Sequence, residues 1–369
     1  GSGGVGGDED DSDEEVPAGQ LTAGEWRDVD NWDFWLELFE DSDSDDDAES
    51  IAKGWRDYEH KWGYDTRERY GVVVTTPDGE PAVDAEVELV DDEGTVWRAR
   101  TDNSGEAHLF AGLFGDETEG SPKIIARDAD ATAERTDIEP NQSEPIGLEL
   151  DESQMPPAAL DLMFVVDTTG SMGDEIRYLQ AELGDTIERV EGEVEEDLSL
   201  RLSVNFYRDQ DDDYIVRSYP FTDDVDQALG QLAEQSAAGG GDYPEAVDQA
   251  LDDAIFEHEW RDEATARLLF LVLDAPPHDN QDSLQTLDNA IEKAAEKGVR
   301  VVPVSASGVD KPTEFLMRAF SIATGGTYVF LTNHSGIGND HLEPTVGEYD
   351  VEYLNDLLVR LIAGWSKQP

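Results

Sequence analysis

The chain has 369 residues, of which 88 are acidic and 25 are basic, so its formal net charge is −63. Its length suggests roughly two or three domains, and its charge argues against nucleic acid and anionic membranes as partners, because both would be repelled. The sequence has no cysteine, which excludes disulfides, thiolate metal sites and a cysteine nucleophile.

The acidic excess runs through every region of the chain and is not confined to a tail. Repulsion among so many carboxylates should destabilise the compact state at low salt, whereas molar salt shortens the Debye length to about 3 Å. The composition resembles that of halophilic archaeal proteins, and we expect adaptation to molar salt.

Residues 1–20 consist mainly of Gly, Ser and acidic residues, which predicts a flexible acidic linker. This start suits the segment after a lipoprotein cleavage site, with a lipid anchor upstream of residue 1, and equally a scar left by cloning. No apolar run reaches the about 18 residues that a membrane-spanning helix needs, so no transmembrane segment is expected.

Residues 21–65 are rich in tryptophan. Trp32, Trp35, Leu36 and Phe39 follow the i, i+3, i+4, i+7 spacing of an amphipathic helix. We therefore expect a helical segment that packs on a neighbouring domain. An aromatic ligand site is the alternative, which we favour less because aromatic side chains mostly supply buried area.

Residues 66–155 contain the strand-like runs RYGVVVTT, AEVELVDD, TVWRART and AHLFAG, separated by the turn signals PDGEP, DDEG and DNSG. A spacing of about ten residues predicts a small antiparallel β-sandwich. The pattern resembles carboxypeptidase-regulatory-like modules, and that resemblance implies a spacer or stalk. The single His108 is expected to pack or to face solvent.

Residues 159–369 alternate strand and helix signals. Strands are expected at 160–167, 199–207, 214–220, 267–274, 299–305 and 327–331, and helices at 171–190, 223–236, 244–258, 281–298, 312–323 and 350–365. This alternation predicts an α/β fold with a Rossmann-like, doubly wound, mostly parallel sheet. The link 209–213 is too short for a crossover, so the strand at 214–220 should be an antiparallel edge strand.

The stretch LDLMFVVDTTGSM, residues 160–172, is the strongest functional signal. Its apolar part predicts a strand buried on both faces, and Asp167, Thr169 and Ser171 follow at i, i+2 and i+4. A carboxylate and two hydroxyls are hard oxygen ligands that suit Mg²⁺, Ca²⁺ or Mn²⁺. Open α/β sheets bind their ligands at this end of their strands.

These residues resemble the metal-ion-dependent adhesion site of von Willebrand factor A domains, whose pattern is Asp-x-Ser/Thr-x-Ser. The later stretch GGGDYPEAVDQAL resembles the Asp-x-Pro-Glu segment in the A domain of integrin β chains. That resemblance implies Glu245 as a further ligand, with Asp242 close to it. The alternative is that Asp242 only caps the following helix and that Glu245 is only favoured there by the helix dipole.

Asp274 ends a second buried strand, and in A domains the residue at this place usually reaches the ion through water. Asp174 and Glu175 stand where integrin β chains carry paired acids of a second, adjacent cation site. Acidic residues in the first turn of a helix are the simpler interpretation of that pair.

We therefore expect a non-enzymatic, divalent-metal-dependent module for protein binding in adhesion or assembly at the cell surface, outside the cell. An acidic residue of a protein partner would complete the ion's coordination. One alternative is a structural or regulatory scaffold with a purely stabilising metal site. A metal-dependent hydrolase is less favoured, because Thr169 stands where phosphatases with an aspartate nucleophile place a second Asp.

Overall fold

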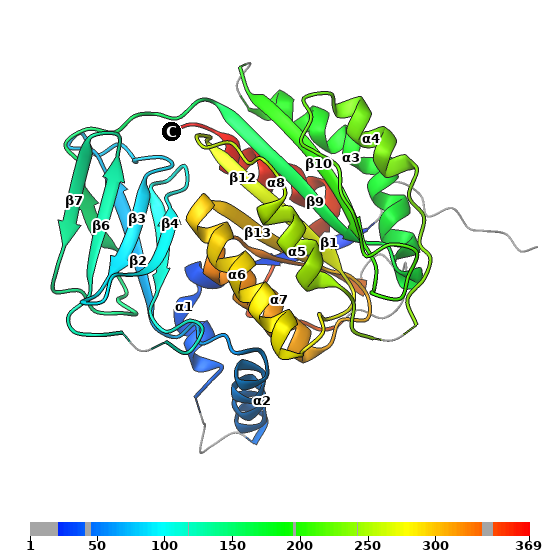
Figure 1. Cartoon of the computed structure of the whole chain (residues 1–369), viewed down its shortest axis with the longest axis horizontal. Helices are drawn as coiled ribbons and strands as arrows, with labels where there is room; N and C mark the ends of the chain where they lie inside the picture. The colour runs from blue at the N-terminus through cyan, green and yellow to red at the C-terminus, as the bar shows by residue number, and fades with distance from the viewer. Residues whose placement is uncertain (1–20, 41–45, 117, 195–196, 242, 334–341) are drawn as a thin grey trace, which may run out of the picture.

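The computed structural model describes residues 21–40, 46–116, 118–194, 197–241, 243–333 and 342–369. A central eight-stranded sheet has the order β11-β10-β9-β12-β13-β14-β1-β15. Figure 1 labels five of these strands: β10, β9, β12, β13 and β1. Five neighbouring strands run parallel: β10 (Ser199–Tyr207), β9 (Ala159–Asp167), β12 (Ala266–Leu273), β13 (Val299–Ser305) and β14 (Tyr328–Leu331). The short β11 (Val216–Arg217) pairs antiparallel at one edge, as the short link before it predicts.

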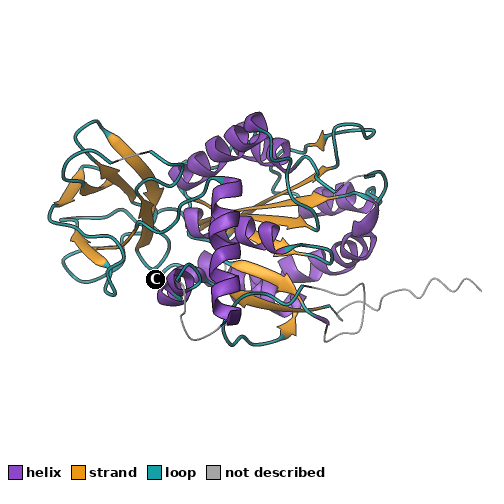
Figure 2. Cartoon of the chain, turned by 90° about the horizontal axis from the view of Figure 1, so that it is seen from below, coloured by secondary structure: helices purple, strands orange, loops and turns teal. Residues whose placement is uncertain are grey.

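Helices cover both faces of this sheet (Figure 2). Every residue of β9 and β12 is buried, as expected for strands covered on both sides. One face packs with α3 (Gly173–Glu193), α4 (Val225–Ala233) and α8 (Leu354–Ser366). The other packs with α5 (Val247–Phe256), α6 (Gln281–Lys297) and α7 (Lys311–Thr324). The predicted doubly wound, mostly parallel α/β sheet is confirmed.

The N-terminal segment differs from the helical prediction at its start. Residues Thr22–Trp26 form β1, which lies between β14 and β15 (Glu352–Tyr353) and pairs antiparallel with both. The sheet therefore includes residues far upstream of 159. Helices follow only afterwards, as α1 (Trp32–Glu37) and α2 (Asp46–Trp62).

Aromatic side chains attach this N-terminal segment to the sheet unit. The ring of Trp35 stacks on Phe315 of α7 with a centroid distance of 5.7 Å, and Trp55 meets the same ring edge-on at 5.8 Å. Beneath them Arg318 forms a fully buried ion pair with Asp28 at 2.6 Å. These tryptophans serve packing, since Trp35 and Trp55 have exposed fractions of 0% and 2%.

Between the N-terminal helices and β9 lies a β unit of two small sheets. One contains β5 (Glu106–Phe110), β2 (Arg69–Thr75) and β8 (Ile146–Glu149); the other contains β4 (Thr95–Arg100), β3 (Glu86–Val90), β6 (Lys123–Asp128) and β7 (Ala131–Arg135). The expected antiparallel pattern holds for the strand pairs of this unit except β2 with β8, which are parallel. His108 is buried in β5 and contacts Arg69.

The β unit is fixed to the amino ends of the central strands. Asp84 accepts two hydrogen bonds from Arg267 at the start of β12, at 2.8 and 2.9 Å, and both side chains are almost fully buried. Asn103 donates to the carbonyls of Gly364 and Lys367 at 2.8 and 2.7 Å. These contacts hold the β unit against the sheet. A stalk that moved independently of the sheet would not have them.

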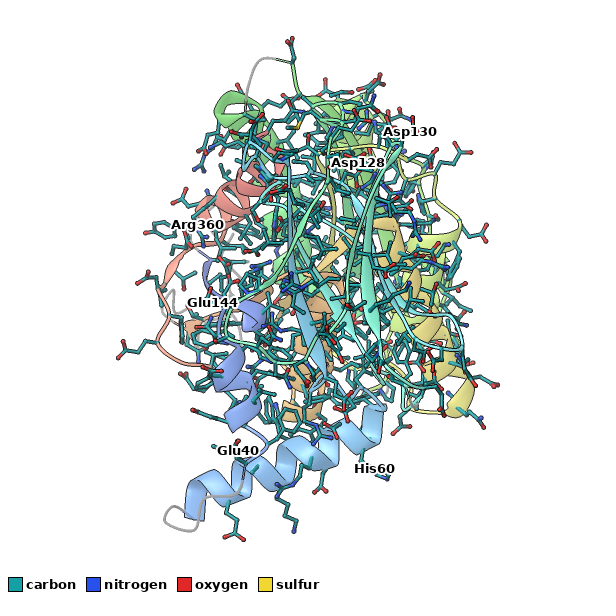
Figure 3. The ribbon with its side chains drawn as sticks, turned by 90° about the vertical axis from the view of Figure 1, so that its left-hand side faces the viewer. Glu40, His60, Asp128, Asp130, Glu144 and Arg360 are labelled. Atoms are coloured by element: carbon teal, nitrogen blue, oxygen red, sulfur yellow. The ribbon has the colours of Figure 1, made fainter. Side chains whose placement is uncertain are left out.

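Acidic side chains lie all over the surface. Glu40, Asp130 and Glu144 come from separate segments, are exposed, and lie around one face of the molecule in Figure 3. None of the helices in the described part of the chain is long and apolar enough to cross a membrane.

Candidate metal site

The candidate site begins with Asp167, the last residue of β9. The backbone N–H and the hydroxyl of Thr169 both donate to its Oδ1, at 2.8 and 2.7 Å. Its Oδ2 is buried and has no hydrogen-bond partner among the described residues. Burial, together with the nearby charge of Asp274, raises the pKa of Asp167 to about 7. One oxygen is thus held in place, and the other is left without a donor.

Asp274 lies beside it because β12 pairs with β9 in parallel register, and both strands end at the same edge of the sheet. Its side chain is buried, and burial raises its pKa. The hydroxyl of Ser171 donates to the Asp274 carboxylate. Ser171 itself is exposed, so the site opens to solvent on that side.

Glu245 reaches the same place from the loop before α5. Gly240 has φ +71°, and a Cβ there would lie 3.2 Å from the Cβ of Thr169 and 3.3 Å from Oε1 of Glu245. Only glycine combines this left-handed conformation with such a close approach. The Glu245 N–H donates to the carbonyl of Pro276 at 2.9 Å, which ties this loop to the loop after β12.

The Glu245 side chain is 4% exposed, and its Oε2 has no hydrogen-bond partner in the part of the chain that is described. Burial and then the charge of Asp167 raise its pKa to about 9. α5 begins at Val247 with Ala246 as the N-cap residue, so Glu245 lies just before the first turn of that helix. Asp242, the other acidic residue predicted in this loop, lies outside the described residues.

A second group of polar side chains surrounds Glu245, and the sequence reasoning did not assign it to the site. Asp209 Oδ1 lies 2.8 Å from Nε2 of His278. Asp212 accepts hydrogen bonds from the backbone N–H of Asp209 and of Gly240. The signal that could have found them is the acidic run 209–213, which follows β10, a third parallel strand that ends at this edge.

Asp174 and Glu175, the predicted second cation site, face different environments. Asp174 is paired with Arg177 on the surface. Glu175 is buried, lies against apolar side chains such as Phe164 and Leu179, and has its pKa raised to about 7 by burial. The structure therefore adds no support to a shared ion at this pair.

The chemistry of the first group fits a divalent cation. Asp167, Glu245 and Asp274 are buried at one edge, and none of them forms an ion pair in the part of the chain that the structure describes. Buried carboxylates without a counter-charge are costly. No three Asp, Glu or His side chains among the described residues are close enough to chelate an ion alone. The hydroxyls of Thr169 and Ser171, and water, would have to contribute.

Together, the fold and this edge define a doubly wound α/β domain with an oxygen-rich site where its parallel strands end. Residues 161–336 match the family model of the von Willebrand factor A domain. With the sheet topology, this match supports a von Willebrand factor A domain over these residues.

The chain is also similar to a protein described as an ariadne-like RING finger protein of Acanthamoeba polyphaga mimivirus. The identity is 28% over 121 residues, which is 33% of this chain and 11% of the viral protein. The chain therefore spans only a small part of that relative's length, and the similarity supports no transfer of activity.

Proposed function

We propose that the edge formed by Asp167, Ser171, Glu245 and Asp274 binds one divalent cation, Mg²⁺ in the first place and Ca²⁺ or Mn²⁺ as alternatives. The observation that carries this proposal is the pair of buried carboxylate oxygens, Oδ2 of Asp167 and Oε2 of Glu245, that lack partners among the described residues. A bound cation would supply the missing positive charge. Thr169 would hold the orientation of Asp167 through its two hydrogen bonds.

The bound ion would serve to recruit a protein partner. A von Willebrand factor A domain commonly mediates metal-dependent protein interaction, and the rim here is accessible, since Gly170, Ser171 and Tyr243 are exposed. A carboxylate of the partner would complete the coordination. Because the cation reverses the local charge, an acidic chain can still bind an acidic ligand at this point.

The proposed setting is adhesion or assembly at the cell surface, outside the cell, with a lipid anchor upstream of residue 1 as one means of attachment. The role is binding and not catalysis. The second candidate is a scaffold in which the ion only stabilises the fold, which the buried charges would also favour.

The test is calorimetric titration of Mg²⁺, Ca²⁺ and Mn²⁺ at constant ionic strength into the wild type, Asp167→Ala and Asp174→Ala. We expect saturable binding of a single ion that is lost in Asp167→Ala and kept in Asp174→Ala, the matched control for an exposed acid nearby. Equal binding by all three proteins would refute the site.

Peptides that display Asp or Glu, with Asn and Gln versions as controls, then separate the two candidates. Binding that needs both the peptide carboxylate and the ion supports recruitment of a partner. An ion that raises the unfolding temperature but confers no carboxylate binding supports the scaffold.

A further inference from the structure

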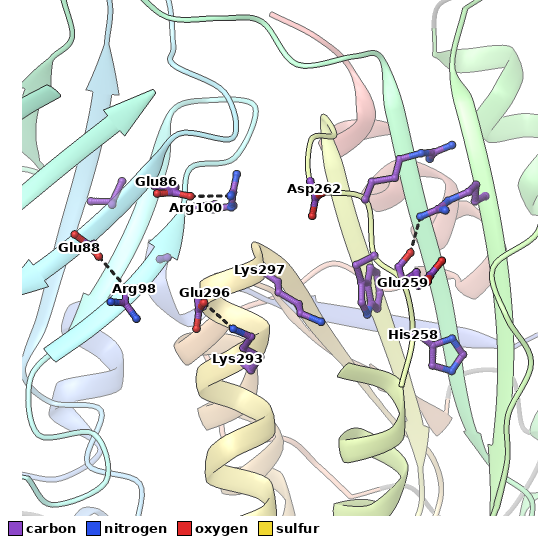
Figure 4. Close-up of a pocket in the computed structure, with 15 residues that line it drawn as sticks. Glu86, Glu88, Arg98, Arg100, His258, Glu259, Asp262, Lys293, Glu296 and Lys297 are labelled. Atoms are coloured by element: carbon purple, nitrogen blue, oxygen red, sulfur yellow. Dashed lines mark hydrogen bonds and ion pairs between the residues drawn. The ribbon is translucent and has the colours of Figure 1, made fainter. Parts of the chain in front are cut away.

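A large cleft lies at the opposite end of the central sheet from Asp167. Its walls are β3 and β4 of the β unit, the last turns of α6, and the segment 258–262 that leads into β12 (Figure 4). Its volume is about 740 Å³, which lies within the roughly 300–1,000 Å³ typical of small-molecule sites. Such sites occur preferentially where two structural units meet.

The lining of this cleft has a far larger share of basic residues than the chain as a whole. Among its lining residues six are Arg or Lys and five are Asp or Glu, whereas the whole chain has 25 basic and 88 acidic residues. The basic residues are Arg98, Arg100, Arg201, Arg261, Lys293 and Lys297. Because basic residues are scarce here, their gathering at one cleft needs a physical reason.

Ion pairs within the walls account for part of it. Arg98 binds Glu88 at 2.8 Å, and Arg201 and Arg261 share the single buried carboxylate of Asp161. Arg100 pairs with Glu86 at 3.0 Å and with Asp84 at 3.5 Å, and Lys293 pairs with Glu296 at 2.7 Å. These contacts hold the walls in shape. In the part of the chain that is described, one basic residue of the lining forms no ion pair.

That cation is Lys297. Its Nζ donates to the carbonyl of Ile255 at 2.6 Å, and no carboxylate of the described residues lies within ion-pair distance of it. Burial lowers the pKa of Lys297, since its ammonium group is partly withdrawn from water. An ammonium group has three N–H donors, so donors remain for a ligand.

Arg100 lies against Gly298, the residue that follows Lys297, because a glycine leaves room for it. A Cβ on Gly298, which has φ +70°, would stand 2.9 Å from Cβ and 3.1 Å from Cδ of Arg100. The stem of Arg100 therefore rests on the residue next to Lys297. Across the cleft, Glu259 and Asp262 are exposed and form no ion pair among the described residues (Figure 4).

We propose that this cleft binds a small, hydroxyl-bearing organic anion, with its phosphate or carboxylate group on Lys297. Hydrogen bonds between an anion and a charged donor of this kind are short and strong. The hydroxyl groups of the ligand donate to Glu259 and Asp262, whose carboxylates accept but cannot donate when ionised. The site is separate from the candidate metal site and does not depend on it.

The test is calorimetric titration of the protein with glucose 6-phosphate, glucuronate, inorganic phosphate and glucose. A chelator is present, so that no anion can bind through a divalent ion. The full chain is used at constant ionic strength, as wild type, Lys297→Gln and Lys123→Gln. Lys123 is the matched control, because it is a lysine on β6 that is paired with Glu134 outside the cleft.

We expect glucose 6-phosphate or glucuronate to bind the wild type saturably and glucose to bind far more weakly. Which anion binds better identifies phosphate or carboxylate as the recognised group. Lys297→Gln should weaken binding about tenfold or more, while Lys123→Gln should leave it unchanged. Lys297→Met, which keeps the apolar stem of the side chain and removes only its charge and donors, provides a second cleft variant if Lys297→Gln does not fold.

Two results would overturn the proposal. One is the absence of saturable binding by any of the anions to the wild type. The other is equal affinity in the wild type and in a folded cleft variant. Loss of metal binding in Asp167→Ala leaves this test unaffected, so the two proposals fail independently.

Discussion

Replacing Asp167 by asparagine should have opposite effects on stability with and without a divalent ion. Asparagine keeps the shape of the side chain and an acceptor for the two donors of Thr169. It removes the charge from an oxygen that is buried and has no partner among the described residues. In the metal-free protein that charge lowers the stability of the folded state. In the metal-loaded protein the same charge would attract the ion.

The size of the metal-free effect follows from the pKa. Burial, and then Asp274, raise the pKa of Asp167 to about 7 in the folded state, against about 4 in an unfolded chain. Between these values the folded state holds a proton that the unfolded state has released, so stability falls as the pH rises from 4 to 7. A gap of about three pH units at about 1.4 kcal/mol each amounts to about 4 kcal/mol above pH 7.

Urea unfolding at pH 8 in a chelator, at constant salt, should therefore show Asp167→Asn to be more stable than the wild type by about 3 kcal/mol, after about 1 kcal/mol for weaker hydrogen bonds from Thr169. The difference should shrink as the pH is lowered towards 4, and saturating Mg²⁺ should reverse its sign. Asp174→Asn, at an exposed ion pair, should stay within about 0.5 kcal/mol of the wild type throughout. A metal-free Asp167→Asn protein that is less stable than the wild type at pH 8 would refute the reasoning.

Three further changes test the packing. Asp84→Asn should cost about 3 kcal/mol in urea unfolding, because Arg267 would stay buried without its full counter-charge; a loss under about 1 kcal/mol, as for surface pairs, would contradict this. Gly298→Ala should lower stability by about 1–2 kcal/mol in thermal unfolding, since φ is +70° and the new Cβ would meet Arg100. Trp35→Ala should cost about 3–5 kcal/mol, because its ring is fully buried against α7; an unchanged unfolding midpoint would show that the N-terminal segment is not part of the folded unit.

The sheet was predictable where the signal is local. β9 and β12 are continuous apolar runs, and the helices between the strands carry their own periodicity, so their positions agree within a few residues. β1 was missed because its five residues have no strong alternation of their own. Its conformation depends on pairing with β14, about 300 residues away in the chain.

In the candidate site, too, the residues with a local sequence signal were predicted and those that depend on tertiary packing were not. Asp167 and Asp274 were identified because each ends a buried strand. Asp209 and Asp212 were missed because an acidic run carries little information in a chain with 88 acidic residues. Glu175 has the local signature of a solvated acid in a first helical turn, yet it is buried. Only the packing of α3 on the sheet decides that outcome.

The two ends of the central sheet are used differently, and the structure gives a reason. The amino ends of β12 and β13 are covered by the β unit through Arg267 and through Arg300, which donates to the carbonyl of Arg100. A large partner cannot approach there, and what remains is a cleft of small-molecule size. The carboxyl ends carry the buried acids beneath an exposed rim at Ser171 and Tyr243.

If both proposals hold, an ion-dependent protein contact and a small anion would occupy opposite ends of the same strands. β12 would then be the element common to both, since Asp274 follows its carboxyl end and the segment 258–262 precedes its amino end.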